Sequence, residues 1–140
     1  DGLFAPKPTP KNRCLSPMGQ GDGCALFLRR RRLKIRTTET LTFALSRSDV
    51  GEGVDSKAQA QNQVALLAAC ELRSSGGNRG GRGGHLIVAT THLKAKKTGA
   101  AELYRQGEIR QLLTAVDRIR MSMRKSGFPS AVLLTGDMNA

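Results

Sequence analysis

The sequence predicts an α+β sandwich with mostly antiparallel β-sheets flanked by helices, and three observations lead to this prediction. Short apolar or alternating runs follow one another up to residue 93 without an intervening helical pattern. One long helical pattern comes next, and a last apolar run follows it. Strands that pair as hairpins, with a helix crossing between the final two, are typical of a mixed sandwich. No glycine-rich phosphate loop follows a strand, which argues against a doubly wound nucleotide fold.

Five segments before the helix are expected to be strands, because each is apolar, β-branched or alternates polar with apolar residues. They are Cys24–Leu28, Leu33–Arg36, Thr40–Leu45, Asn62–Leu72 and His85–Leu93. The alanine content of 62–72 also allows a helix, but antiparallel pairing with 85–93 across the glycine-rich residues between them favours a strand. Residues 1–23 are rich in Pro, Gly and Lys and are expected to be a loop that ends at the turn Asp22-Gly23.

Residues 100–125 predict the helix, since apolar side chains recur there at three- and four-residue steps. These side chains are Ile109, Leu112, Leu113, Val116, Ile119 and Met123. Gly127 is expected to cap the helix, and Pro129 prevents its continuation. A buried strand over 131–135 should follow and deliver Asp137 at its end.

Two segments, 46–61 and 74–84, are expected to be flexible insertions in one partial domain that spans 1–140. The first is polar and contains Gly, Ser and Asp. The second alternates Gly pairs with Arg and Ser, so it is either an RNA-binding Arg-Gly tract or an insertion at a hairpin tip.

The charge balance favours a polyanionic partner. The chain has 23 Lys and Arg against 11 Asp and Glu, a net charge of +12. It has no Trp, one Tyr and four Phe, so the charge argues for contact with phosphate rather than for base stacking. The run Arg29-Arg30-Arg31-Arg32 is a solvated turn, a nucleic-acid patch or a targeting tract.

Cysteine usage favours an intracellular protein. The three cysteines, Cys14, Cys24 and Cys70, suggest neither a disulfide framework nor a zinc site, and the last two lie in apolar runs as expected of small core residues. No apolar run reaches the 18 residues of a membrane span. We expect a cytoplasmic or mitochondrial location.

The segment Gly136-Asp137-Met138-Asn139-Ala140 is the first candidate site, because it directly follows an apolar strand. On an extended backbone Asp137 and Asn139 face the same side. Such oxygen ligands suit Mg²⁺ or a metal-bound water. Taken alone, Asp and Asn after a strand are usually turn formers.

The second candidate site is Thr91-His92-Leu93-Lys94-Ala95-Lys96-Lys97, at the end of the 85–93 strand. The lysines would hold a phosphate while His92 donates a proton or a hydrogen bond to an oxygen on phosphorus. A lone histidine at a strand end is otherwise mostly structural, so this interpretation depends on the Gly-Asp-x-Asn segment that follows one helix later.

A strand ending in Thr-His-Leu, then a helix, then a strand ending in Gly-Asp-x-Asn resembles the endonuclease/exonuclease/phosphatase superfamily. The resemblance is closest to its nocturnin-like branch, which is related to the deadenylases. Further stretches agree in order and approximate spacing: Asp1-Gly2-x-Phe4, Pro6-Lys7-Pro8, Asp22–Phe27, Asn62–Ala65, Leu93–Ala95, Gln106-Gly107 and Leu112-Leu113. The resemblance implies a four-layer α/β sandwich, of which this chain would be an internal, C-terminally truncated fragment.

The resemblance also implies roles by position. His92, Asp137 and Asn139 match catalytic residues, and Asp137 with Asn139 forms a partial site for Mg²⁺, with Mn²⁺ as a substitute. The residues that match positions around the substrate phosphates are Lys7, Lys94, Lys96 and Asn62. The principal metal-binding glutamate is expected upstream and the general-base histidine downstream, so the full-length enzyme should be active and this segment alone inactive.

Three functions fit the sequence. The first is removal of a phosphate from a dinucleotide such as NADP(H), and the second is 3′ exonuclease action on polyadenylate. The third is a non-catalytic basic module that binds RNA. The expected partner is therefore a nucleotide or RNA phosphate.

Overall fold

The computed structural model of the chain describes residues 1–8, 22–46, 60–73, 84–124, 127 and 129–139, with the backbone alone at 60–62. In chain order the strands and the helix are β1 (Gly2–Pro6), β2 (Gly23–Phe27), β3 (Leu33–Ala44), β4 (Ala60–Leu72), β5 (His85–His92), α2 (Gly99–Arg124) and β6 (Ser130–Asp137). The predicted insertions 46–61 and 74–84 lie almost entirely outside the described residues, so their character stays a prediction.

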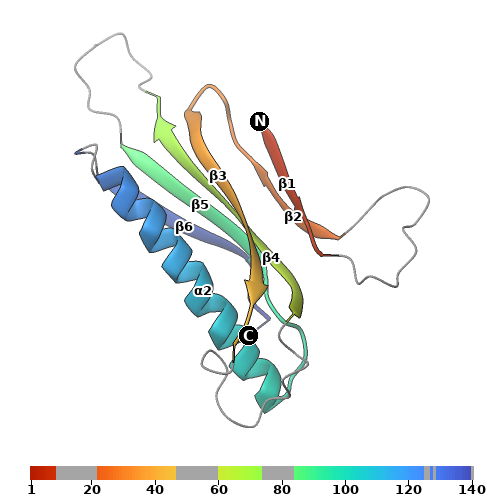
Figure 1. The fold of residues 1–140 in the computed structure, drawn as a ribbon. Helices are drawn as coiled ribbons and strands as arrows, with labels where there is room; N and C mark the ends of the chain where they lie inside the picture. The colour runs from red at the N-terminus through yellow and green to blue at the C-terminus, as the bar shows by residue number, and fades with distance from the viewer. Residues whose placement is uncertain (9–21, 47–59, 74–83, 125–126, 128, 140) are drawn as a thin grey trace.

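The described elements form three layers (Figure 1). A four-stranded sheet in the order β3-β4-β5-β6 is the middle layer, with α2 on one face and the pair β1-β2 on the other. All neighbouring strands are antiparallel except β5 and β6, which the crossing helix joins in parallel. The predicted combination of hairpins with one helical crossover is therefore confirmed.

Strand β4 supplies the core on both faces of the middle sheet. Its side chains alternate, so Ala65, Leu67 and Ala69 contact the helix layer while Val64 and Leu66 contact β1 and β2. Because both faces are covered, Val64–Cys70 is an unbroken apolar run without polar alternation. Cys24 and Cys70 are buried small core residues on the β1-β2 side, as predicted.

Helix α2 has the predicted length and ends. The Thr98 hydroxyl accepts a hydrogen bond from the Ala101 amide at 3.2 Å, which caps its first turn. At the other end Gly127 adopts a φ of 76° and donates its amide to the Arg124 carbonyl at 2.9 Å. Leu112, Val116 and Ile119 are buried against the sheet as the apolar periodicity predicted, whereas Leu113 is 44% exposed and lies outside the packing face.

The N-terminal segment was predicted wrongly as a loop, since Gly2–Pro6 is a strand. Its residues pair with β2 in a continuous antiparallel register from Gly2 opposite Phe27 to Pro6 opposite Gly23. The proline is tolerated because it occupies the end of a strand in a two-stranded sheet. The pairing partner, rather than the local composition, makes this segment extended.

Two further boundaries differ from the prediction. Leu33–Ala44 is one strand where two were expected, because β3 lies at the margin of the described sheet and can carry polar residues along its length. The last strand extends to Asp137 and is not buried among the described residues. Val132, Leu133 and Leu134 remain 40%, 48% and 37% exposed, since β6 pairs with β5 alone.

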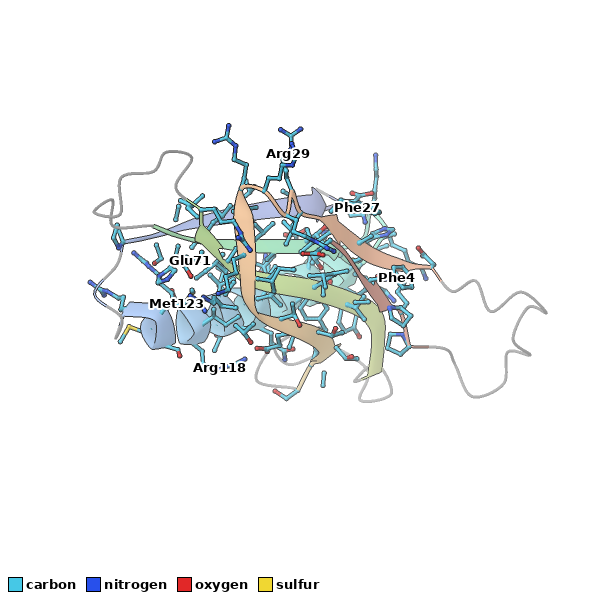
Figure 2. All side chains as sticks on the ribbon, turned by 90° about the horizontal axis from the view of Figure 1, so that it is seen from above. Phe4, Phe27, Arg29, Glu71, Arg118 and Met123 are labelled. Carbon is cyan, nitrogen blue, oxygen red and sulfur yellow. The ribbon has the colours of Figure 1, made fainter. Side chains whose placement is uncertain are left out.

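The arginine run forms the turn between β2 and β3, which confirms the solvated-turn interpretation of its structure. Arg29, Arg30, Arg31 and Arg32 are all exposed, and Arg29 points away from the sheets in Figure 2. Arg30 pairs with Asp1. No helix among the described residues is both long enough and apolar enough to cross a membrane.

Gly136 permits the close approach of β6 to β5. Its φ is 125°, a conformation that residues with a side chain rarely adopt, and a Cβ there would lie 1.9 Å from the Thr91 carbonyl oxygen. A glycine is therefore required one residue before Asp137.

Replacing Gly136 by Ala should destabilise the protein by about 3 kcal/mol, because the positive φ and the collision with Thr91 both oppose a side chain. Urea unfolding followed by circular dichroism measures this. Gly99→Ala is the matched control, since nothing lies within 4 Å of a Cβ at that helix start. An unchanged unfolding midpoint for the Gly136 variant would contradict the packing described for this strand end.

Candidate functional site

Two strand ends place the predicted catalytic residues side by side. In the parallel register of β5 and β6, His92 lies directly opposite Asp137. The two side chains are 3.9 Å apart, from His92 Nε2 to Asp137 Oδ2, and are 37% and 64% exposed. This separation is too long for a direct hydrogen bond, so both groups can meet a third group from solvent.

Lys7 joins this pair from the other sheet, as the sequence predicted for a residue of the same site. Its ammonium lies 3.2 Å from His92 Nδ1 and 2.6 Å from Asp22 Oδ2. An ammonium group can only donate, so Nδ1 must be the acceptor of the imidazole ring. The N–H of the ring is then at Nε2, which is the nitrogen that faces Asp137.

Asn139 reaches the site by a different route from the one predicted. The backbone does not continue extended past Asp137, because Asn139 has a φ of 51° and donates its amide to Asp137 Oδ1 at 2.9 Å. This is an Asx turn, in which the Asp side chain substitutes for a backbone acceptor. The Asn139 side chain donates Nδ2 to the Leu93 carbonyl at 2.9 Å, which leaves its Oδ1 for another partner.

The remaining predicted residues are not joined to His92 or Asp137 by any hydrogen bond or ion pair of their described side chains. Lys94 and Lys96 follow β5, but no hydrogen bond or ion pair among the described residues joins either side chain to His92 or Asp137. Their backbone carbonyls both accept hydrogen bonds from Arg105 Nη1, at 3.0 and 2.9 Å. Asn62 has its backbone in β4, while its side chain lies outside the described part of the chain.

Three residues that support the site were not predicted from the sequence. Asp22 was assigned to a turn, yet it binds Lys7, and this contact lowers the pKa of the Asp22 carboxyl below its ordinary value. Arg105 and Glu108 were not singled out from the sequence. A signal existed for Glu108, because it lies four residues before Leu112 and thus within the buried stripe of α2.

Glu108 is a fully buried carboxyl group beneath the segment that follows β5. Its Oε2 accepts the Lys94 amide at 2.8 Å, while its buried Oε1 has no hydrogen-bond partner. Burial raises the pKa of Glu108, and the hydrogen bond from the Lys94 amide and the charges of Lys94 and Arg105 oppose this only in part.

The oxygen donors at the edge fit Mg²⁺ in kind, although they are few. Asp137 offers one exposed carboxylate and Asn139 one amide oxygen, whereas Mg²⁺ takes one or two carboxylates together with water and phosphate oxygens. Within the described ranges, no three acidic, histidine or cysteine side chains gather as a metal site. These residues can therefore form part of a magnesium site.

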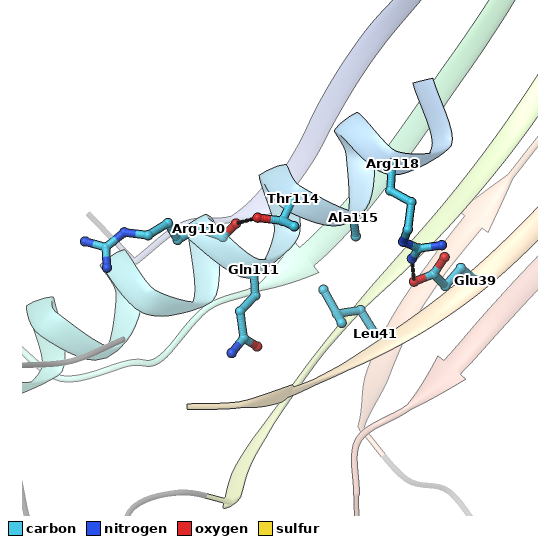
Figure 3. Close-up of a pocket in the computed structure, with 7 residues that line it drawn as sticks. All are labelled: Glu39, Leu41, Arg110, Gln111, Thr114, Ala115 and Arg118. Atoms are coloured by element: carbon cyan, nitrogen blue, oxygen red, sulfur yellow. Dashed lines mark hydrogen bonds and ion pairs between the residues drawn. The ribbon is translucent and has the colours of Figure 1, made fainter. Parts of the chain in front are cut away.

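A separate groove lies between α2 and β3 (Figure 3). It is about 320 Å³ in volume and shares no residue with the cluster of Lys7, His92, Asp137 and Asn139. Glu39 and Arg118 form an ion pair at its border. The residues lining the groove are Glu39, Leu41, Arg110, Gln111, Thr114, Ala115 and Arg118.

Comparison with known proteins identifies the class. No family model matches the chain. It is 30% identical over 139 residues to nocturnin of Drosophila melanogaster, which covers 99% of this chain and 18% of the fly protein. Its fold matches the human nocturnin catalytic domain, solved with a bound sulfate anion, with a TM-score of 0.66 and 28% identity. That match covers 100% of this chain and 43% of the human one.

The sandwich fold, with a strand-end histidine beside a Gly-Asp-x-Asn edge, is that expected of the endonuclease/exonuclease/phosphatase superfamily. Within that superfamily the chain is nocturnin-like over its whole length. It spans less than half of the human domain and about a fifth of the fly protein. The predicted family and fold class are confirmed.

Replacing Lys7 by Met should raise the pKa of Asp22 towards its ordinary value, because the hydrogen bond from Lys7 is the largest cause of its lowering. The lowered pKa means that this pair stabilises the fold at neutral pH, and that the stabilisation is lost as pH falls through the Asp22 pKa. Carboxyl carbon NMR measures the pKa, with Lys97→Met as the matched control. An unmoved Asp22 pKa would show that Lys7 does not bind there in solution.

Replacing Glu108 by Gln should flatten the pH dependence of stability. A carboxyl whose folded pKa is raised costs stability above that pKa, and the cost disappears as pH falls towards the unfolded value. As pH rises, the unaltered chain should therefore lose more unfolding free energy than the variant. Urea unfolding at several pH values checks this, and parallel pH curves would refute it.

Proposed function

We propose that the protein containing this chain is a Mg²⁺-dependent phosphoester hydrolase that removes a phosphate from a dinucleotide such as NADP(H). The observation that carries the proposal is the meeting of Lys7, His92 and Asp137 at one edge, from three strand ends far apart in the sequence. A cation, an imidazole N–H and a carboxylate within reach of one another suit a phosphate ester and a water molecule. The likeness to nocturnins supports a hydrolase of this type.

Each residue has a role that follows from its contacts. The Lys7 ammonium can only donate a hydrogen bond, so it holds the His92 ring in the tautomer that accepts at Nδ1. The ring N–H is then at Nε2, the nitrogen that faces Asp137. His92 then donates to a phosphoryl oxygen and stabilises the charge that develops there. Asp137, which is 64% exposed, orients the attacking water in line with the bond that breaks.

Asp137 and the Oδ1 atom of Asn139 would contribute to holding Mg²⁺, with Mn²⁺ as a substitute, in a site completed by residues beyond this chain. The metal would neutralise the charge of the phosphoryl oxygens. Lys94 and Lys96 would bind further phosphates of the substrate, since both lie in the segment directly after His92. Asn62, whose side chain lies outside the described residues, is likewise proposed to bind a phosphate of the substrate.

A 3′ exonuclease acting on polyadenylate is the second candidate, because the same edge would serve both reactions. The net charge of +12 and the exposed arginine turn between β2 and β3 favour a long polyanion. The sulfate bound to the human nocturnin domain is compatible with either substrate, because both present a tetrahedral oxyanion.

The test compares full-length protein on NADPH and on an oligoadenylate, with Mg²⁺ and with the metal chelated. We expect phosphate release from NADPH, and His92→Gln or Asp137→Asn should lower kcat/KM by about 100-fold or more. Asp117→Asn, an exposed acid on α2, is the matched control and should leave the rate unchanged. The 140-residue chain alone should be inactive.

Shortening of the oligoadenylate without phosphate release from NADPH would replace the first candidate by the second. If neither substrate reacts, while RNA binds with an affinity that Asp137→Ala leaves intact and that falls steeply with salt, the protein is a basic RNA-binding module and the hydrolase proposal fails.

A further inference from the structure

One peptide group links the candidate site to the interior of the protein. The peptide between Leu93 and Lys94 accepts a hydrogen bond at its carbonyl from Asn139 Nδ2, at 2.9 Å. The same peptide donates its N–H to Glu108 Oε2, at 2.8 Å. Asn139, this peptide and Glu108 therefore form a continuous hydrogen-bonded chain from the edge to helix α2.

The two bonds of this chain strengthen each other. A carboxylate that accepts the N–H of a peptide polarises the group and makes its carbonyl oxygen a better acceptor. Glu108 is fully buried and Leu93 is 1% exposed, so water does not compete effectively at the inner end. The acceptor strength of the Leu93 carbonyl, which holds Asn139, thus depends on Glu108, a buried acid that does not itself contact Asn139.

Arg105 secures the next stretch of backbone, one helical turn away from Glu108. It donates to the carbonyls of Lys94 and Lys96, and it is itself held by Glu102 through a hydrogen bond of 2.6 Å. Lys96 has a φ of 113°, which a residue with a side chain adopts only when its surroundings impose it. Helix α2 therefore fixes the whole turn from Leu93 to Lys96.

We propose that Glu108 is a positioning residue for the candidate site, which orients Asn139 through the Leu93–Lys94 peptide so that the side-chain carboxamide of Asn139 faces the phosphate. The identity of the bound group as a phosphate rests on the proposed function, whereas the positioning of Asn139 rests on the hydrogen bonds alone. A purely structural acid would need both carboxyl oxygens satisfied, yet Oε1 is buried without a partner. The fold bears this cost at the helix residue that accepts the Lys94 amide.

The experiment compares two variants of Glu108 in the intact protein. Glu108→Leu removes the acceptor at similar volume, whereas Glu108→Gln keeps an oxygen that can accept the Lys94 amide. NMR follows the hydrogen exchange of that amide and the two side-chain N–H signals of Asn139. In Glu108→Leu we expect exchange at Lys94 to accelerate at least 10-fold and the Asn139 signals to collapse towards those of a free carboxamide. Glu108→Gln should retain both, as should the control Asp117→Asn.

A reciprocal variant keeps the proposal testable if Glu108→Leu does not fold. Asn139→Ala, at a half-buried position of the edge, should move the Lys94 amide proton upfield, because the peptide loses its polarising partner. Unchanged Asn139 signals in a folded Glu108→Leu protein, or an unmoved Lys94 proton in Asn139→Ala, would overturn the proposal.

Kinetic measurements distinguish the positioning role of Glu108 from the proposed hydrolase activity. If NADPH is hydrolysed, Glu108→Leu should lower kcat by about 10-fold and change KM little, and Glu108→Gln should restore kcat. An unaltered kcat would overturn the catalytic relevance of Glu108. NMR changes as expected in a protein without hydrolase activity would leave the positioning in place and refute the proposed function instead.

Discussion

The parallel pairing of β5 with β6 is the constraint on which the rest of the site depends. It alone sets His92 opposite Asp137, because the two residues are direct partners in the register. The pairing in turn requires Gly136, whose backbone approaches Thr91 more closely than any side chain allows. A shift of one residue would turn Asp137 to the other face of the sheet and separate it from the histidine.

Three layers meet at this edge, and each contributes one kind of control. The β1-β2 pair supplies Lys7, which fixes the ring nitrogen that can donate from His92. The middle sheet supplies His92 and Asp137 themselves. Helix α2 supplies Glu108 and Arg105, which hold the backbone after β5 and through it Asn139. The site is thus rigid because its supports come from regular elements.

Much of this arrangement could be predicted from the sequence, where local pattern and tertiary structure agree. The helix followed from its apolar spacing, and β5 followed from its β-branched run with His92 at the end. What could not be predicted depends on partners distant in sequence. Gly2–Pro6 is extended because β2 pairs with it, and the contact of Lys7 with His92 joins residues 85 positions apart. The Asx turn at Asn139 replaced the expected extended backbone, because a local hydrogen bond outcompeted continuation of the strand.

The central claim is that His92 and Asn139 face one phosphate group together. Titration of the protein with inorganic phosphate, followed by ¹⁵N NMR of the histidine ring and the asparagine side chain, tests it most directly. We expect His92 Nε2 and the Asn139 carboxamide to shift with the same saturation curve, while His85 at the opposite end of β5 does not move. Shifts confined to the arginine turn, with His92 and Asn139 unaffected, would contradict it.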